Sequence, residues 1–144
     1  LLGVRTRIES YDPVIWQQVM QVNLNAPFMM TQILMPLLER SNHASIVFTS
    51  SSVGRKAKAY WGAYGISKFA TEGLMQTLAD ELESVSKIRT NCINPGATRT
   101  QMRADAYPAE NPASVKSAEE IMPLYLYLMG DDSLEVNGQS LDAQ

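Results

Sequence analysis

The sequence is poor in cysteine and histidine, on which disulfides, many catalytic sites and many metal sites depend. Among 144 residues there is one cysteine, Cys92, and one histidine, His43. A single cysteine cannot close an internal disulfide, which fits a reducing cytoplasm, and its apolar surroundings indicate an inert core residue. His43 lies in a polar turn and has no evident role as a base, so the chain does not resemble a hydrolase. No metal site is expected.

Neither a strong charge nor a long apolar run is present. Lysine and arginine number 12 and aspartate and glutamate 15, a net charge of −3, and no basic patch stands out. Nucleic acid is therefore not an expected partner. No apolar run reaches the length of a membrane span and no signal peptide is visible, so we expect no membrane partner and a cytoplasmic location. A hydrophobic content of 45% suffices for the core of one domain.

Periodicity and turn signals predict helices that alternate with strands. We expect helices over 12–39, 61–85 and 117–129 and strands over 45–51, 88–93 and 138–142. The first helix starts at an acidic N-cap followed by proline, Asp12 and Pro13, and the third at a capping box, Ser117 with Glu120. Pro27 and Pro36 could each kink the first helix. This alternation predicts a parallel sheet with right-handed crossovers and helices on both faces.

The segment 54–60 carries Arg55, Lys56 and Lys58. It is either a solvated basic loop or part of the wall of a substrate entrance, and the first interpretation is favoured. The aromatic residues outside the motifs are expected in the core or in an interface. They are Trp16, Trp61, Tyr125 and Tyr127.

The residues that carry chemistry are Ser51, Tyr64 and Lys68. Ser51 ends the predicted strand 45–51, and Tyr64 and Lys68 lie one turn apart on one face of the next helix. Ligands bind at that end of the strands in open α/β sheets. A phenol titrates near pH 10, and a nearby ammonium lowers its pKa toward the working range of an acid/base catalyst. The set suits proton transfer to or from a carbonyl or alcohol that Ser51 orients. Ser50 and Ser52 compete with Ser51, which only the spacing favours.

A Ser followed thirteen positions later by Tyr-x-x-x-Lys resembles the active site of the classical short-chain dehydrogenases/reductases. Further segments match the patterns of that family at its spacing. They are Val22-Asn23-Leu24, the serine run 49–54, the Asn-x-x-x-Pro-Gly turn from Asn91 to Gly96, and Thr100. The resemblance extends from about Trp16 to the C-terminus. Segments 91–102 and 121–132 are most similar to a bacterial subgroup, the YciK-type oxidoreductases.

The resemblance implies catalytic roles for four residues. Tyr64 would be the general acid/base, and Ser51 would orient the substrate. Lys68 would lower the pKa of Tyr64 and bind the nicotinamide ribose. Asn23 would hold a water in a proton relay, although a plain polar residue in mid-helix is the alternative.

The resemblance also implies a cofactor, NADP or NAD, and a small carbonyl or alcohol substrate. Tyr64, Lys68 and the segment after the second predicted strand would bind the nicotinamide end. In that segment the expected contacts are Pro95, Gly96, Thr98 and Thr100, while Asn91 would give structural support. Segment 98–106 would be the substrate loop, with a possible short helix. The residue that decides between NAD and NADP lies outside this sequence.

The glycine-rich phosphate loop of the family does not occur among the eight scattered glycines. We therefore expect residues 1–144 to be a single partial domain, the C-terminal half of a doubly wound Rossmann fold. The two long helices imply a homodimer or homotetramer. Two other hypotheses stay open: a non-catalytic regulatory protein on the same fold, and a truncated fragment that serves only in assembly.

Overall fold

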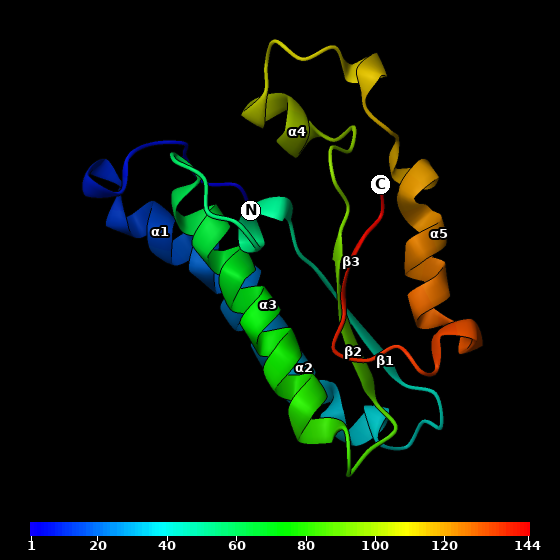
Figure 1. Ribbon diagram of the computed structural model, residues 1–144. Helices are drawn as coiled ribbons and strands as arrows, with labels where there is room; N and C mark the ends of the chain where they lie inside the picture. The colour runs from blue at the N-terminus through cyan, green and yellow to red at the C-terminus, as the bar shows by residue number, and fades with distance from the viewer.

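The computed structural model describes residues 1–144 and contains a three-stranded parallel sheet in the order β1-β2-β3. The strands are β1 (Ser45–Thr49), β2 (Arg89–Asn94) and β3 (Ser140–Asp142). Helix α3 (Gly62–Leu82) joins β1 to β2, and α5 (Ala118–Met129) joins β2 to β3. Figure 1 shows α1, α2 and α3 on one side of the sheet and α5 on the other. The predicted α/β fold with helices on both faces is confirmed.

The first predicted helix is one rod with a π-helical segment inside it. It consists of α1 (Pro13–Met20), the π-helical segment Gln21–Asn25, and α2 (Ala26–Leu38). The Asp12 side chain accepts from the amide of Val14 at 2.7 Å, as an N-cap does. In a regular α-helix the N–H of residue 27 would donate to the carbonyl of Asn23, four positions earlier. Proline has no N–H, so Pro27 cannot make this bond. The hydroxyl of Thr71 lies 3.5 Å from that carbonyl instead. Just before Pro27 the helix thus has a wider, π-helical turn, while Pro36 lies inside α2.

The remaining boundaries differ from the predictions by a few residues. Strand β1 ends at Thr49, so Ser51 lies beyond it, and α3 ends at Leu82. The short helix in segment 98–106 is α4 (Gln101–Ala106). The capping box of α5 is present, because Glu120 Oε2 accepts from the Ser117 amide at 2.7 Å and the Ser117 hydroxyl accepts from the Glu120 amide at 3.4 Å.

The core between α3 and the sheet is small and apolar. Met75 of α3 packs against Phe48 of β1 and Cys92 of β2, and Met75 and Cys92 are completely buried. Burial raises the pKa of the Cys92 thiol to about 12. The thiol is therefore un-ionised at neutral pH, which confirms the prediction of an inert core residue.

Apolar side chains remain exposed along α2. They include Phe28, Met29, Met30, Ile33 and Leu37, of which Ile33 is 71% exposed. Helix α3 adds Ile66 and Phe69, which are also exposed. None of the helices combines the length and the apolar character that a membrane span requires.

Arg89 holds the end of α5 against the beginning of β2. Its side chain is buried and donates to the carbonyl oxygens of Leu128 at 3.2 Å, Ser133 at 2.7 Å and Gly130 at 3.3 Å. It also donates to the Ser133 hydroxyl at 2.7 Å. The last carbonyls of a helix have no partner within the helix and attract a cation. Arg89 therefore satisfies these acceptors where water cannot reach them.

We expect Arg89→Met to lower the free energy of unfolding by about 3 kcal/mol, because several buried acceptors lose a charged donor. The matched control is Lys87→Met in the exposed turn before β2, which should change stability by less than about 0.5 kcal/mol. Urea unfolding followed by circular dichroism measures both. Equal effects of the two substitutions would contradict the anchoring role.

Candidate active site

A cavity of about 430 Å³ lies where the carboxyl ends of β1 and β2 meet the N-terminal part of α3. Its lining includes most of the predicted site residues, which are Ser51, Tyr64, Lys68, Pro95, Gly96, Thr98 and Thr100. They are distant in sequence but adjacent here because parallel strands end at the same edge of the sheet. The cavity is at the place that the sequence predicts for a ligand.

Tyr64 and Ser51 face each other in this cavity. Burial raises the pKa of the Tyr64 phenol above its ordinary value, and a hydrogen bond from Ser51 acts in the opposite direction. Burial dominates because it disfavours the charged phenolate. Of the three consecutive serines, Ser50 also lines the cavity, but its buried hydroxyl has no partner. Ser52 is exposed and starts a 3₁₀ turn.

Lys68 lies beside Tyr64 but donates to the backbone. Its ammonium donates to the backbone carbonyl of Thr49 at 2.7 Å and lies 5.5 Å from the centre of the Tyr64 ring. Burial lowers the pKa of Lys68. In the ligand-free structure desolvation thus prevails at Tyr64, and the lowering of its pKa by Lys68 stays a prediction.

Asn23 lies behind the cavity and not in its lining. Its amide donates to the Leu1 carbonyl at 2.8 Å and to the Ser67 hydroxyl at 3.0 Å, and its oxygen accepts from the Leu1 amino group at 2.7 Å. Leu1 lines the cavity, so Asn23 reaches the cavity through it. The π-helical segment holds Asn23 with only 8% of its surface exposed. Its role in a water relay stays a prediction.

The turn after β2 forms another part of the wall. Gly96 has φ +71°, and a Cβ there would lie 2.6 Å from the Gln144 side chain. Gln144 donates to the carbonyls of Pro95 at 2.6 Å and Ala97 at 2.8 Å. The Thr100 hydroxyl caps α4 by accepting from the Arg103 amide at 3.2 Å. The turn is therefore held in a conformation that favours glycine.

Asn91 is fully buried but outside the cavity. It donates to the Val136 carbonyl at 2.8 Å and accepts from the Gln139 amide at 2.9 Å. It thus fixes the segment that leads into β3. This placement agrees with the structural role that the sequence suggested.

Aromatic residues of the cavity wall were missed by the sequence analysis. Trp61 and Tyr125 were expected in the core or an interface. Trp61 does lie in a core cluster with Val53 and Ala106, and both residues also line the cavity, as does Tyr107. The guanidinium of Arg5 lies 4.8 Å from the Trp61 ring centre, and that of Arg103 lies 3.8 Å from the centre of Tyr107. The position of Trp61, one turn before Tyr64, was the signal that could have indicated its place.

Arg55 has partners that the solvated-loop interpretation did not foresee. The solvated-loop interpretation holds for Lys56 and Lys58, which are exposed. The Arg55 side chain is only 31% exposed and pairs with Asp142 at 2.8 Å. Its Nε also lies 3.5 Å from the Glu72 carboxylate, so Arg55 connects the end of β3 to α3. A loop arginine cannot be assigned such partners from sequence spacing alone.

The pKa of Tyr64 can be measured directly. In the full-length protein without ligand, tyrosinate absorbance that is lost in a Tyr64→Phe variant should titrate with a midpoint above about 10. Ser51→Ala should raise this midpoint further, because the phenolate loses its hydrogen-bond donor. A midpoint below 10, or a fall on Ser51→Ala, would contradict the geometry described.

Comparison with known proteins agrees with this geometry. A sequence model of the short chain dehydrogenase family matches residues 3–111. The Escherichia coli K12 protein described as uncharacterized oxidoreductase YciK is 58% identical over 144 residues, which are 100% of this chain and 56% of that protein. This chain thus spans little more than half the length of that relative.

Solved structures match equally well. A short chain dehydrogenase of Salmonella enterica serovar Typhi superposes with a TM-score of 0.97 at 60% identity, over 100% of this chain and 59% of that one. A Shigella flexneri short chain dehydrogenase complexed with NADP superposes with a TM-score of 0.96 at 58% identity, again over 100% and 59% of the two chains. The motifs, the fold and these matches lead to one assignment. This chain belongs to the short chain dehydrogenase family.

Proposed function

We propose that the full-length protein is an NAD(P)-dependent oxidoreductase that moves a hydride between the nicotinamide and a carbonyl or alcohol carbon. The observation that carries the proposal is the meeting of Ser51, Tyr64 and Lys68 in one cavity. Folding does not require a hydroxyl, a phenol and an ammonium together at a strand end, whereas proton transfer to a bound oxygen does. Family membership supports the same reaction class.

NADP is the favoured cofactor. Relatives from Shigella flexneri and Escherichia coli were solved with NADP and NADPH. The residues of this chain fit the nicotinamide end, because the backbone of the Pro95–Gly96 turn and the hydroxyl-bearing residues Thr98 and Thr100 line the cavity together. When bound, the nicotinamide supplies or accepts the hydride.

Four polar side chains then have defined tasks. Tyr64 donates its proton to the carbonyl oxygen as the hydride reaches the carbonyl carbon, and it takes the proton back during alcohol oxidation. Ser51 donates a hydrogen bond to the same oxygen and orients it. Lys68 binds the ribose and keeps a positive charge near the phenol, and Asn23 holds the relay water.

The competing proposals are a regulatory protein that uses this fold without catalysis and a fragment that serves only in assembly. The regulatory protein would bind the cofactor without turnover, and the assembly fragment would neither bind the cofactor nor turn over. Turnover of NADPH with a panel of aldehydes and ketones separates the three. The combination of Asn23, Ser51, Tyr64 and Lys68 favours the enzyme.

Tyr64→Phe should lower kcat by at least about 10²-fold, because a positioned acid contributes about 10²–10⁴ to the rate. The NADPH dissociation constant and the unfolding temperature should stay near those of the parent protein, since only one hydroxyl is removed. Tyr60→Phe is the matched control, because Tyr60 is 53% exposed and lies outside the cavity lining. Its activity should be unchanged. A Tyr64→Phe enzyme that keeps most of its activity would remove Tyr64 from the acid/base role.

We further expect a homodimer or homotetramer that uses the exposed apolar side chains of α2 and α3. Phe69→Glu should shift the mass measured by light scattering toward the monomer, because a buried carboxylate without a partner is costly. Val85→Glu is the control, since Val85 is 76% exposed beyond the end of α3. A parent protein that is monomeric at micromolar concentration would refute the expectation.

A further inference from the structure

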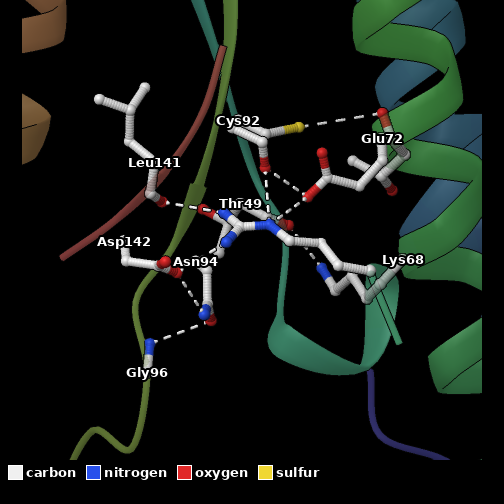
Figure 2. Close-up of polar contacts among 11 residues, drawn as sticks. Thr49, Lys68, Glu72, Cys92, Asn94, Gly96, Leu141 and Asp142 are labelled. Atoms are coloured by element: carbon white, nitrogen blue, oxygen red, sulfur yellow. Dashed lines mark hydrogen bonds and ion pairs between the residues drawn. The ribbon is translucent and has the colours of Figure 1, made fainter. Parts of the chain in front are cut away.

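Glu72 lies one turn beyond Lys68 on the same face of α3, as Figure 2 shows. It is only 5% exposed. Its carboxylate accepts from the Ser140 hydroxyl at 2.7 Å and lies 3.5 Å from Arg55 Nε. A carboxylate buried this deeply is costly unless hydrogen bonds and a cation compensate it. Arg55 is the cation that does so.

All three guanidinium nitrogens of Arg55 donate hydrogen bonds to residues of β3. Nε donates to the Ser140 hydroxyl at 3.0 Å, Nη1 to Asp142 Oδ1 at 2.8 Å and Nη2 to the Leu141 carbonyl at 3.2 Å. Arg55 directly follows the 3₁₀ turn Ser52–Gly54, which follows Ser51. The planar fork of arginine therefore ties the segment that carries Ser51, and with it α3, to β3.

The connection continues from Asp142 into the turn that lines the cavity. The same oxygen Oδ1 of Asp142 accepts from Asn94 Nδ2 at 2.7 Å. Asn94 is the last residue of β2, and its own oxygen accepts from the Gly96 amide at 3.2 Å. Figure 2 shows Asp142, Asn94 and Gly96 in this succession. One polar path thus leads from α3 beside Lys68 to Gly96.

We propose that Arg55 is a positioning residue, which acts through Asp142 and Asn94 to hold the Pro95–Gly96 turn at a fixed place relative to Lys68. The meaning of this position for the nicotinamide rests on the proposed function. An isolated exposed ion pair contributes little, but this one joins a buried carboxylate to a hydrogen-bonded network with one arrangement. Without the path, the turn keeps only the side-chain bonds of Gln144 to the Pro95 and Ala97 carbonyls and the longer ones of the Thr98 hydroxyl to the Pro95 and Gly96 carbonyls, at 3.3 and 3.4 Å.

The first test replaces Arg55 by Gln in the full-length protein. We expect the NADPH dissociation constant, measured by fluorescence titration, to rise about tenfold and kcat to fall, because small misplacements of reacting groups are costly. Arg55→Lys should restore the charge but only part of the affinity, since an ammonium cannot bond three acceptors in a plane. Lys56→Gln in the same loop is the matched control, and it should bind NADPH as the parent does.

The second test separates positioning from general stability. Asn94→Ala leaves the contacts between Glu72 and Arg55 in place, so it should fold even if Arg55→Gln does not, and it should weaken NADPH binding similarly. Because both substitutions interrupt one path, the double variant should bind NADPH about as weakly as either single variant. If Arg55 and Asn94 acted independently, the fold-increases in the NADPH dissociation constant of the two single variants would multiply in the double variant. Multiplying effects, or parent-like affinity in folded Arg55→Gln, would overturn the proposal.

A third readout needs neither cofactor nor substrate. In the ligand-free protein, hydrogen exchange of the Gly96 amide should accelerate in Arg55→Gln and Asn94→Ala and not in Lys56→Gln. A parent protein that binds no NADPH would refute the proposed function, and the exchange rates would then decide on the path alone. Unchanged exchange at Gly96 in both path variants would show that the path does not hold the turn.

Discussion

The close approach of α3 to the turn after β1 determines the geometry of the candidate site. Gly54 lies so near the helix that a Cβ on it would be 2.8 Å from the Cβ and 2.9 Å from the carbonyl carbon of Lys68. Only glycine fits such a contact without displacement of the helix. The contact brings the backbone just past Ser51 against the helical turn that bears Tyr64 and Lys68. The hydroxyl, the phenol and the ammonium therefore meet because two backbone segments touch.

Two arginines fix the C-terminal part of the chain to this arrangement in different ways. Arg89 is buried and satisfies carbonyls at the end of α5, so it fixes where the last crossover begins its return to the sheet. Arg55 is partly exposed and bonds the strand β3 itself. A short strand such as β3 has few backbone hydrogen bonds of its own, so side-chain donors contribute much of its attachment.

The sequence predicted the order and type of the elements because their signals are local. The N-cap of α1, the capping box of α5 and the alternation of apolar segments each depend on residues a few positions apart. The cavity residues Ser51, Tyr64 and Gly96 followed from motif spacing and from the shared edge of a parallel sheet. Arg55 could not be placed in this way, because its partner Asp142 is distant in sequence. The upward shift of the Tyr64 pKa was not foreseen, because burial cannot be inferred from residue spacing.

The protonation state of the Tyr64 phenol bears on whether the site favours reduction of a carbonyl or oxidation of an alcohol. Since burial raises the pKa of Tyr64, the phenol keeps its proton at neutral pH, which is the form that can donate to a carbonyl oxygen. Lys68 meanwhile is engaged by the Thr49 carbonyl. Oxidation of an alcohol would require the phenolate, which this environment disfavours until a further positive charge enters the cavity. Under the proposed function, the ligand-free site holds the phenol form that reduction uses, and oxidation would depend on the charge that the bound ligand brings.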